Sequence, residues 1–482
     1  MSTTPTPTPI PTPTPTPSLT LTRPAPTDNP TKPLIILCDG TWCGRETNTR
    51  SNIYKLAELF GVRIGARIQS PDGVLYLEGV GLGSSFLDYI FNGITGQDIA
   101  QQCITIYEYL VHNYTYPTHE IWLFGLSRGA YLARAVAGMI NNCGIVHPLR
   151  IAGTNEIDAP QTRLLCETVY NLYRSPYATN APHAPQSLRF RQTKSWPLIG
   201  DEDPADRTAP RFHPPIRFMG LLDTVGSLGM PEYTGGVGLD WPVFYDQHVS
   251  TVVANVHHAV SLHDRLFVFQ PCLVSRDHAR HCRRDWERFG VTRQEWLPGC
   301  HYDLGRQRFR FLREFGGGWL ESLLASRWFG FASKVIEPNH VLADLALRWM
   351  LLAIRAQSTT VNYEVVANIE RVIEDVTESI RGRAREPGRT GDGDVYGHVL
   401  SYAPFGSLLL DVVRTLRGTR GKVSALYQLF FDLRDRLIPD DNAVVYDFYG
   451  FDEDIPGCVG DLARVSERRY PSKSYVKWRL RQ

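Results

Sequence analysis

The pentapeptide GLSRG at residues 125–129 constrains this chain more than any other feature of its sequence. A short apolar run of strand type, 121–124, comes directly before it, and a helical run rich in small residues, 128–142, comes directly after it. A serine placed between a buried strand and a helix occupies a sharp, strained turn, whose flanking glycines avoid side-chain clashes. The pattern therefore predicts a sheet that carries Ser127 above its edge.

Short apolar runs alternate with helical stretches on both sides of this turn. The strands that we expect are 34–38, 74–77, 121–124, 216–222 and 294–297. The helices that we expect between them are 52–60, 99–111, 128–142 and 252–262. Such alternation predicts an α/β fold, with a doubly wound, mainly parallel sheet and helices on both of its faces.

Composition excludes several classes of protein. Lys and Arg number 51 against 50 Asp and Glu, so no global basic field recruits nucleic acid. The nine cysteines are odd in number and form no C-x-x-C pair, which argues against a disulfide framework or a zinc site and for reduced thiols. The first residues lack a secretory signal, and no apolar run reaches the roughly 18 residues of a spanning helix. We therefore expect a cytoplasmic protein without metal, nucleic-acid partner or transmembrane segment.

A nucleophilic serine needs an acid that orients its base, and in this class of sheet the acid follows the serine along the chain. Asp223 comes directly after the apolar run 216–222, which is the position such an acid requires. Asp240 and Asp246 are alternatives, but no strand precedes them. Asp264 is a third alternative and ends a predicted helix, where a solvated charge is the simpler interpretation.

The base is expected after the acid. His301 lies in a glycine-bounded loop behind the short strand 294–297, from which it can reach across the top of the sheet. His257, His258 and His263 fall on one predicted helix and lack the i, i+4 spacing of a zinc motif, so we interpret them as structural.

Five motifs now stand in chain order between residues 34 and 330. They are CDGTW at 38–42, GVGLG at 79–83, LFGLSRGA at 123–130, LDTVGSLG at 222–229 and PGCHYDLG at 298–305. Together they closely resemble the α/β-hydrolase family typified by type VI secretion phospholipase effectors, which includes fungal-type members. The resemblance implies esterase or lipase-like chemistry without a cofactor, with Ser127 as nucleophile, Asp223 as acid and His301 as base.

The resemblance also places an oxyanion hole. Gly125 and Gly129 complete the nucleophile elbow, and the backbone N–H of Arg128 at the helix N-terminus is one donor. The second donor is expected in the turn after the first core strand, at Gly40 or Thr41.

The chain departs from the family pattern at two points. An Asn commonly follows the DGTW block, whereas Cys43 stands here. The His-x-Asp motif usually leads into a glycine-rich stretch, whereas here Gly305 is followed by Arg306 and Gln307. Both changes could reshape the pocket, so they bear on the substrate rather than on the three reacting side chains.

Three segments complete the expected organisation. Residues 1–32 form a disordered Thr/Pro-rich arm, 33–334 the α/β-hydrolase catalytic domain, and 335–482 a mainly helical C-terminal region. Within the catalytic domain, the proline-rich insertion at about 176–214 falls between nucleophile and acid, and we predict that it forms a mobile lid over the substrate entrance.

The expected function is hydrolysis of small-molecule or lipid esters, with transient membrane contact possible in principle and the oligomeric state open. The alternative is a catalytically idle scaffold that uses the same fold to bind a protein partner. A complete Ser, Asp and His set in the right order favours the enzyme.

Overall fold

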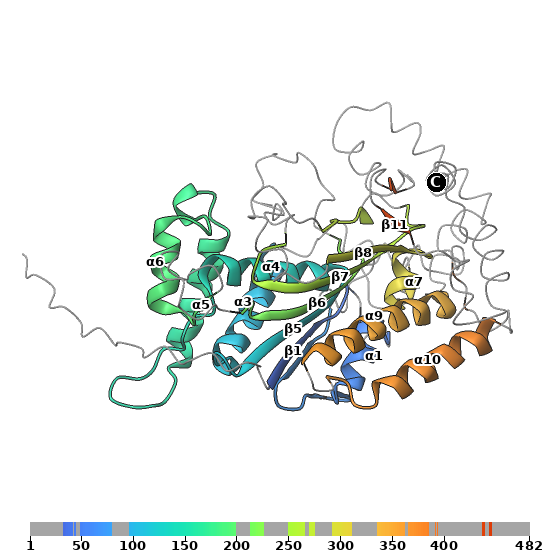
Figure 1. Ribbon diagram of the computed structural model, residues 1–482, viewed down its shortest axis with the longest axis horizontal. Helices are drawn as coiled ribbons and strands as arrows, with labels where there is room; N and C mark the ends of the chain where they lie inside the picture. The colour runs from blue at the N-terminus through green and yellow to red at the C-terminus, as the bar shows by residue number, and fades with distance from the viewer. Residues whose placement is uncertain are drawn as a thin grey trace, which may run out of the picture.

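The computed structural model describes most of the chain up to residue 384 and short pieces beyond it (Figure 1). The described residues are 32–79 except 42 and 45–48, 96–198, 213–225, 249–274 except 266–268, 292–310, 335–384 except 362–364, 391, 393, 436–438 and 443–445. The Thr/Pro-rich arm up to residue 31 and most of the expected C-terminal region beyond residue 384 lie outside them.

The centre of the fold is a seven-stranded sheet in the order β11-β8-β7-β6-β5-β1-β4. Its strands are β1 (Lys32–Cys38), β4 (Val74–Leu77), β5 (His119–Leu126), β6 (Ile216–Leu222), β7 (Val253–Ser261), β8 (Thr292–Leu297) and β11 (Val444–Val445). Every neighbouring pair is parallel, so the predicted α/β fold with a mainly parallel sheet is confirmed.

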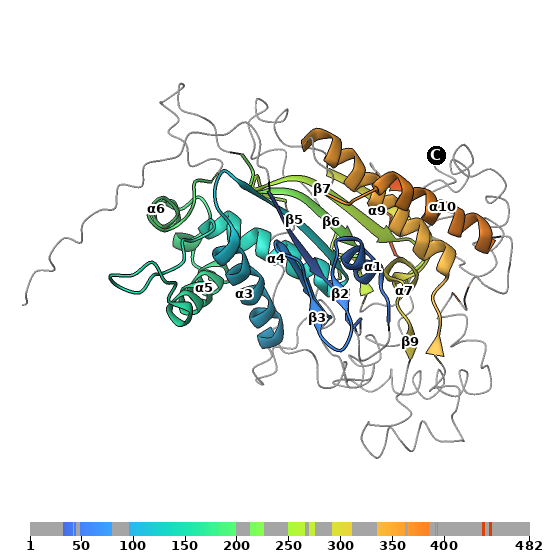
Figure 2. The same ribbon diagram turned by 90° about the horizontal axis from the view of Figure 1, so that it is seen from below.

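Helices cover both faces of this sheet (Figure 2). One face carries α3 (Gly96–Asn113), α4 (Arg128–Cys143) and α5 (Ala159–Tyr173), and the other carries α1 (Asn52–Leu59), α9 (His340–Val361) and α10 (Ile369–Ala384). Smaller elements are β2 (Arg63–Ile64) with β3 (Ile68–Gln69), β9 (Phe309–Arg310) with β10 (Val335–Ile336), η1 (Ala178–Asn180), α6 (Pro185–Lys194) and α7 (His301–Gly305). None of the described helices is both long and apolar enough to cross a membrane.

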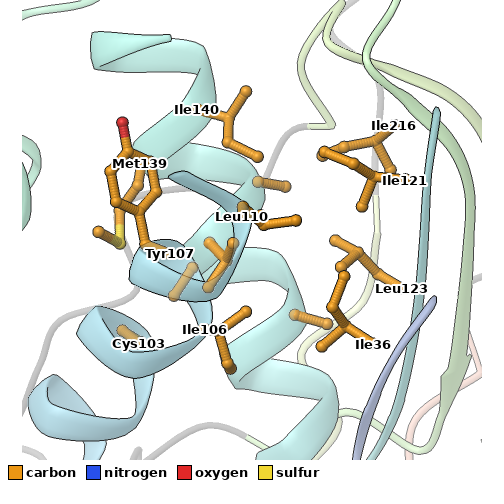
Figure 3. Packing of buried hydrophobic residues seen from close by; sticks show 14 of the residues in the cluster. Ile36, Cys103, Ile106, Tyr107, Leu110, Ile121, Leu123, Met139, Ile140 and Ile216 are labelled. Atoms are coloured by element: carbon orange, nitrogen blue, oxygen red, sulfur yellow. The ribbon is translucent and has the colours of Figure 1, made fainter. Parts of the chain in front are cut away.

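The alternation of side chains along β5 shows why a central strand is apolar throughout. Ile121 and Leu123 point into the cluster formed with α3 and α4 (Figure 3), whereas Trp122 and Phe124 belong to the cluster on the opposite face. Successive residues of a strand face opposite sides of the sheet, and here both sides are covered by helices. All four side chains are therefore buried.

One predicted helix is wrong. Residues 252–262 were expected to be helical, but Val253–Ser261 is strand β7, which lies between β6 and β8 and is buried along its whole length. A strand covered on both faces has a nearly continuous apolar pattern, which periodicity cannot distinguish from a buried helix. His257 and His258 are consequently neighbours on a strand and point to opposite faces of the sheet.

The structure describes the first part of the insertion predicted at about 176–214. Its first part forms η1 and α6, and the buried Arg191 of α6 donates to the backbone carbonyl of Asn142 at the C-terminal end of α4 (2.9 Å). A helix of 16 residues rises about 24 Å, so this part lies at the opposite end of α4 from Ser127 (Figure 1). This part is packed against the fold; residues 199–212 lie outside the described residues, so the lid stays a prediction.

The C-terminal part of the chain shares the core of the sheet. Met350 and Ile354 of α9 belong to the same buried cluster as Phe124 and Phe218, and β11 pairs in parallel with β8. The boundary expected at residue 334 therefore does not divide the hydrophobic core between two bodies.

The connection between β5 and α4 leaves no room for side chains at its glycines. A Cβ on Gly129 would lie 2.1 Å from the backbone oxygen of Cys38, and one on Gly125 would lie 2.5 Å from the backbone nitrogen of Ala130. Both obstacles are backbone atoms, which cannot move aside as a flexible side chain can. The end of β1 and the start of α4 are thereby held in direct contact.

We expect Gly129→Ala to lower the free energy of unfolding by on the order of 3 kcal/mol, because its methyl group would push β1 and α4 apart. Urea unfolding followed by circular dichroism measures this as a lower midpoint. The matched control is Gly382→Ala in α10, where a Cβ meets nothing within 4 Å. That change should be neutral or stabilise by up to about 1 kcal/mol, and equal midpoints for the two variants would contradict the close packing.

Candidate active site

Three buried side chains meet at the carboxyl end of the sheet. Ser127 lies between β5 and α4, Asp223 follows β6, and His301 begins α7 behind β8. Nε2 of His301 lies 2.9 Å from Oγ of Ser127, and Nδ1 of His301 lies 2.6 Å from Oδ2 of Asp223. The structure thus brings together the three residues that the sequence predicts as nucleophile, acid and base.

The charge of Asp223 settles which nitrogen of His301 carries the proton. Burial by itself raises the pKa of this carboxyl, but the guanidinium of Arg436 and the hydrogen bond from His301 outweigh burial and hold the pKa well below its usual range. An ionised carboxylate only accepts, so Nδ1 of His301 donates to it. Nε2 is then left to accept a hydrogen bond from the hydroxyl of Ser127.

The backbone is strained at two of the three residues. Ser127 has φ 57° and Asp223 has φ 44°, in the region that residues with a side chain rarely adopt. The N–H of Ser127 donates to the carbonyl of Leu222 (2.9 Å), which ties the elbow to the strand that precedes the acid. Strain of this kind persists where surrounding structure enforces it, and it is frequent at functional sites.

Two contacts hold His301 in place, one to its backbone N–H and one to a face of its ring. Its N–H donates to Oδ2 of Asp264 (2.9 Å), and the ring of Phe269 stacks on the imidazole at 4.7 Å with an interplanar angle of 12°. Asp264, one of the alternative acids, thus contacts the backbone of His301 and not its ring. The other two alternatives, Asp240 and Asp246, lie outside the described residues.

Asp303 fixes the short helix that begins with His301. Its Oδ2 accepts from the N–H of Cys300 (3.0 Å), and its Oδ1 accepts from the N–H of Asn339 (2.7 Å) just before α9. These bonds cap α7 and join it to the C-terminal helix pair.

The remaining histidines of this region are neutral and structural. His258 accepts the N–H of Thr224 through Nε2 (3.1 Å), and His263 accepts the N–H of Gly299 through Nδ1 (3.0 Å). Burial lowers the pKa of His257 and His258 to about 4 and that of His263 to about 3. Across the described part of the chain, no three His, Cys, Asp or Glu side chains gather where they could hold a metal ion.

The turn after β1 lies beside the serine, with one difference from the prediction. Gly40 was expected as an oxyanion donor, but its N–H donates to Oδ1 of Asp39 (2.8 Å). The hydroxyl of Thr41, the next residue, accepts a hydrogen bond from Nε of Arg128. The side chain of Arg128 therefore joins the N-terminus of α4 to the turn.

Asp39 anchors the turn to two other elements. Its carboxylate accepts from the hydroxyls of Ser51 (2.7 Å) and Tyr76 (2.8 Å) as well as from Gly40. Burial raises the pKa of Asp39 to about 6, although these three donors lower it. At neutral pH the ionised carboxylate therefore links the end of β1 to the start of α1 and to β4.

The two departures from the family pattern contact each other. Nε2 of Gln307 lies 3.0 Å from Sγ of Cys43 and donates to the carbonyl of Thr41 (3.1 Å). Burial raises the pKa of the Cys43 thiol well above its ordinary value, so the thiol stays neutral. Gln307, which follows α7, thus contacts both Thr41 and Cys43 of the turn after β1.

Sequence reasoning missed Arg436, whose guanidinium contacts both oxygens of Asp223. Nη1 lies 2.6 Å from Oδ1 and Nη2 lies 3.0 Å from Oδ2. The two residues are 213 positions apart in the chain, and no motif surrounds Arg436. Arg436 is 1% exposed, and burial is not visible in the sequence.

Comparisons with known proteins identify the family of this chain. The family model for the catalytic domain of Tle1-like phospholipase effectors of the type VI secretion system matches residues 32–353. A solved structure of the Tle1 effector bound to the VgrG spike from the type 6 secretion system is 15% identical, with 76% of this chain and 81% of that chain covered and a TM-score of 0.32. No curated protein matches the sequence. Because the family model matches more than half of the chain, from β1 into α9, the chain belongs to the family of type VI secretion phospholipase effectors with a Tle1-like catalytic domain.

Proposed function

We propose that this protein is a serine hydrolase that cleaves carboxylic esters, lipid esters among them, through an acyl-enzyme. The observation that carries the proposal is the unbroken line of hydrogen bonds from the hydroxyl of Ser127 through the imidazole of His301 to Asp223. A hydroxyl aligned with a neutral imidazole, whose other nitrogen donates to a carboxylate, is activated for attack on a carbonyl.

In the proposed acylation step, Oγ of Ser127 forms a bond to the carbonyl carbon of the ester while its proton moves to Nε2 of His301. Asp223 stabilises the imidazolium that results. Collapse of the tetrahedral intermediate breaks the bond to the leaving alcohol, and the alkoxide takes the proton back from Nε2. Water then repeats the sequence on the acyl-enzyme and releases the acid, so no cofactor is needed.

The oxyanion of the intermediate would lie between α4 and the turn after β1. The backbone N–H groups of Arg128 and Thr41 are the donors that we propose, since Gly40 is engaged with Asp39. The positive end of the dipole of α4 adds to this stabilisation. The contacts from Arg128 and Gln307 to Thr41 keep this turn in place before substrate arrives.

Membership of a phospholipase effector family supports a lipid ester as substrate. Such a substrate requires transient contact with aggregated lipid. Cys43 and Gln307, at which the chain departs from the family pattern, contact each other beside the turn after β1, and we propose that they bear on which ester is preferred.

We expect Ser127→Ala to lower kcat for a p-nitrophenyl ester by at least about 10³-fold, because the acyl-enzyme can no longer form. The variant should unfold at the same temperature as the wild type and lose labelling by a fluorophosphonate probe. Ser70→Ala, at an exposed serine, is the matched control and should retain both activity and labelling. A wild-type protein that neither labels nor turns over esters would instead indicate the idle scaffold.

Asp223→Asn should lower kcat by about 10²-fold or more, since an amide cannot hold the imidazole in the required tautomer or stabilise its charge. Asp264→Asn and Asp303→Asn should be milder, because these carboxylates contact backbone N–H groups. The three variants are compared by steady-state kinetics at one pH. A mild Asp223→Asn beside a severe Asp264→Asn would assign the acid to Asp264.

A substrate panel tests the lipid part of the proposal. We expect kcat/KM to rise with acyl length among p-nitrophenyl esters, and phospholipid vesicles to be hydrolysed at rates above those with Ser127→Ala. Chromatography of the released fatty acid distinguishes cleavage of the ester from any other loss of phospholipid. Hydrolysis confined to short soluble esters would retain the serine chemistry and reject a lipid substrate.

A further inference from the structure

Arg436 is a buried cation that makes or breaks no bond and carries no proton in the proposed reaction. Only 1% of its surface is exposed, whereas its neighbour Leu437 is 84% exposed. An unpaired buried charge is strongly destabilising, so a guanidinium in this position must have partners. Its partners are the residues around His301.

The first partner is the carboxylate of Asp223, which already accepts several hydrogen bonds. Its Oδ1 accepts from the N–H of Ser261 (2.9 Å), and its Oδ2 accepts from the hydroxyl of Ser261 (3.0 Å) and from His301. Arg436 adds one donor to each oxygen. The bidentate geometry leaves the carboxylate a single orientation, with Oδ2 aimed at the imidazole.

The second set of partners is two backbone carbonyls. Arg436 donates to the carbonyl of Ser261 (2.8 Å) and to the carbonyl of Phe269. The ring of Phe269 is the one that stacks on His301. One guanidinium therefore contacts both the acid that bonds the imidazole and the residue that covers its face.

We propose that Arg436 is a positioning residue of the site, which fixes the carboxylate of Asp223 and the ring of Phe269 on two sides of His301. This inference rests on the proposed function. The family model ends at residue 353, so the residue lies beyond the matched catalytic domain. On this proposal Arg436, which precedes edge strand β11 in the chain, belongs to the active site.

The charge of Arg436 also has a measurable consequence. A cation beside the Asp223–His301 pair disfavours an added proton on the pair, and removing it favours that proton. The acid limb of kcat/KM reports protonation of the essential base in the free enzyme. The other ionisable groups described beside the pair are His258, Asp264 and Tyr302. Burial is the largest cause of the lowered pKa of His258 and Arg436 adds a smaller contribution, so His258 stays neutral when Arg436 is replaced.

The test compares Arg436→Met, Arg436→Lys and the exposed neighbour Leu437→Ala in the full-length chain, with pH profiles of kcat and kcat/KM on a p-nitrophenyl ester. We expect Arg436→Met to lower kcat about tenfold or more and to move the acid limb to higher pH by about one unit. Arg436→Lys keeps the charge but not the bidentate geometry, so it should lower kcat less and leave the acid limb in place. Leu437→Ala should match the wild type.

A folded Arg436→Met protein with the kcat and pH profile of the wild type would overturn the inference. A lower kcat with an unmoved acid limb in both Arg436 variants would also overturn it, because that result would assign Arg436 a merely structural role. Should Arg436→Met fail to fold, Arg436→Lys decides: reduced kcat supports the inference and wild-type kcat contradicts it. Ser127→Ala run in parallel separates the two proposals. If Ser127→Ala is as active as the wild type, the proposed function has failed. If Ser127→Ala is inactive, the Arg436 variants test the positioning role by itself.

Discussion

The buried charge of Asp223 is the constraint on which the candidate site depends. Its carboxylate is fully enclosed, and an ionised group in the interior needs matched donors. Ser261, His301 and Arg436 supply them from the end of β7, from α7 and from the segment before β11. Segments far apart in the sequence must therefore meet at one point, and a parallel sheet allows this because the carboxyl ends of its strands share one edge.

The order of the strands explains why Ser127 and the turn after β1 are neighbours. Strand β1 lies between β4 and β5, so the chain turns from one side of the sheet to the other at this place. Loops behind such strands separate and leave a crevice in which ligands bind. The close contact of Gly129 with the carbonyl of Cys38 then sets the N-terminus of α4 against the turn that holds Thr41.

Local patterns predicted the central features of the site, and long-range contacts determined the rest. The elbow at Ser127 and the positions of Asp223 and His301 behind apolar strands follow from neighbouring residues alone. Strand β7 was mistaken for a helix because burial on both faces removes the alternation that distinguishes strands. The N–H of Gly40 is engaged by its neighbour's side chain, and Arg436 reaches the acid across 213 residues, so only the folded structure could show either.

The central claim is that Ser127 carries a covalent acyl group during turnover. Rapid mixing of the protein with a p-nitrophenyl ester, acid quenching within the first turnover and mass spectrometry of the digested protein test it most directly. The account predicts a burst of p-nitrophenol close to one equivalent per site when deacylation is slow, and an acyl mass increment on the peptide that contains Ser127. An increment on another residue, or turnover by a Ser127→Ala protein with the same increment, would contradict it.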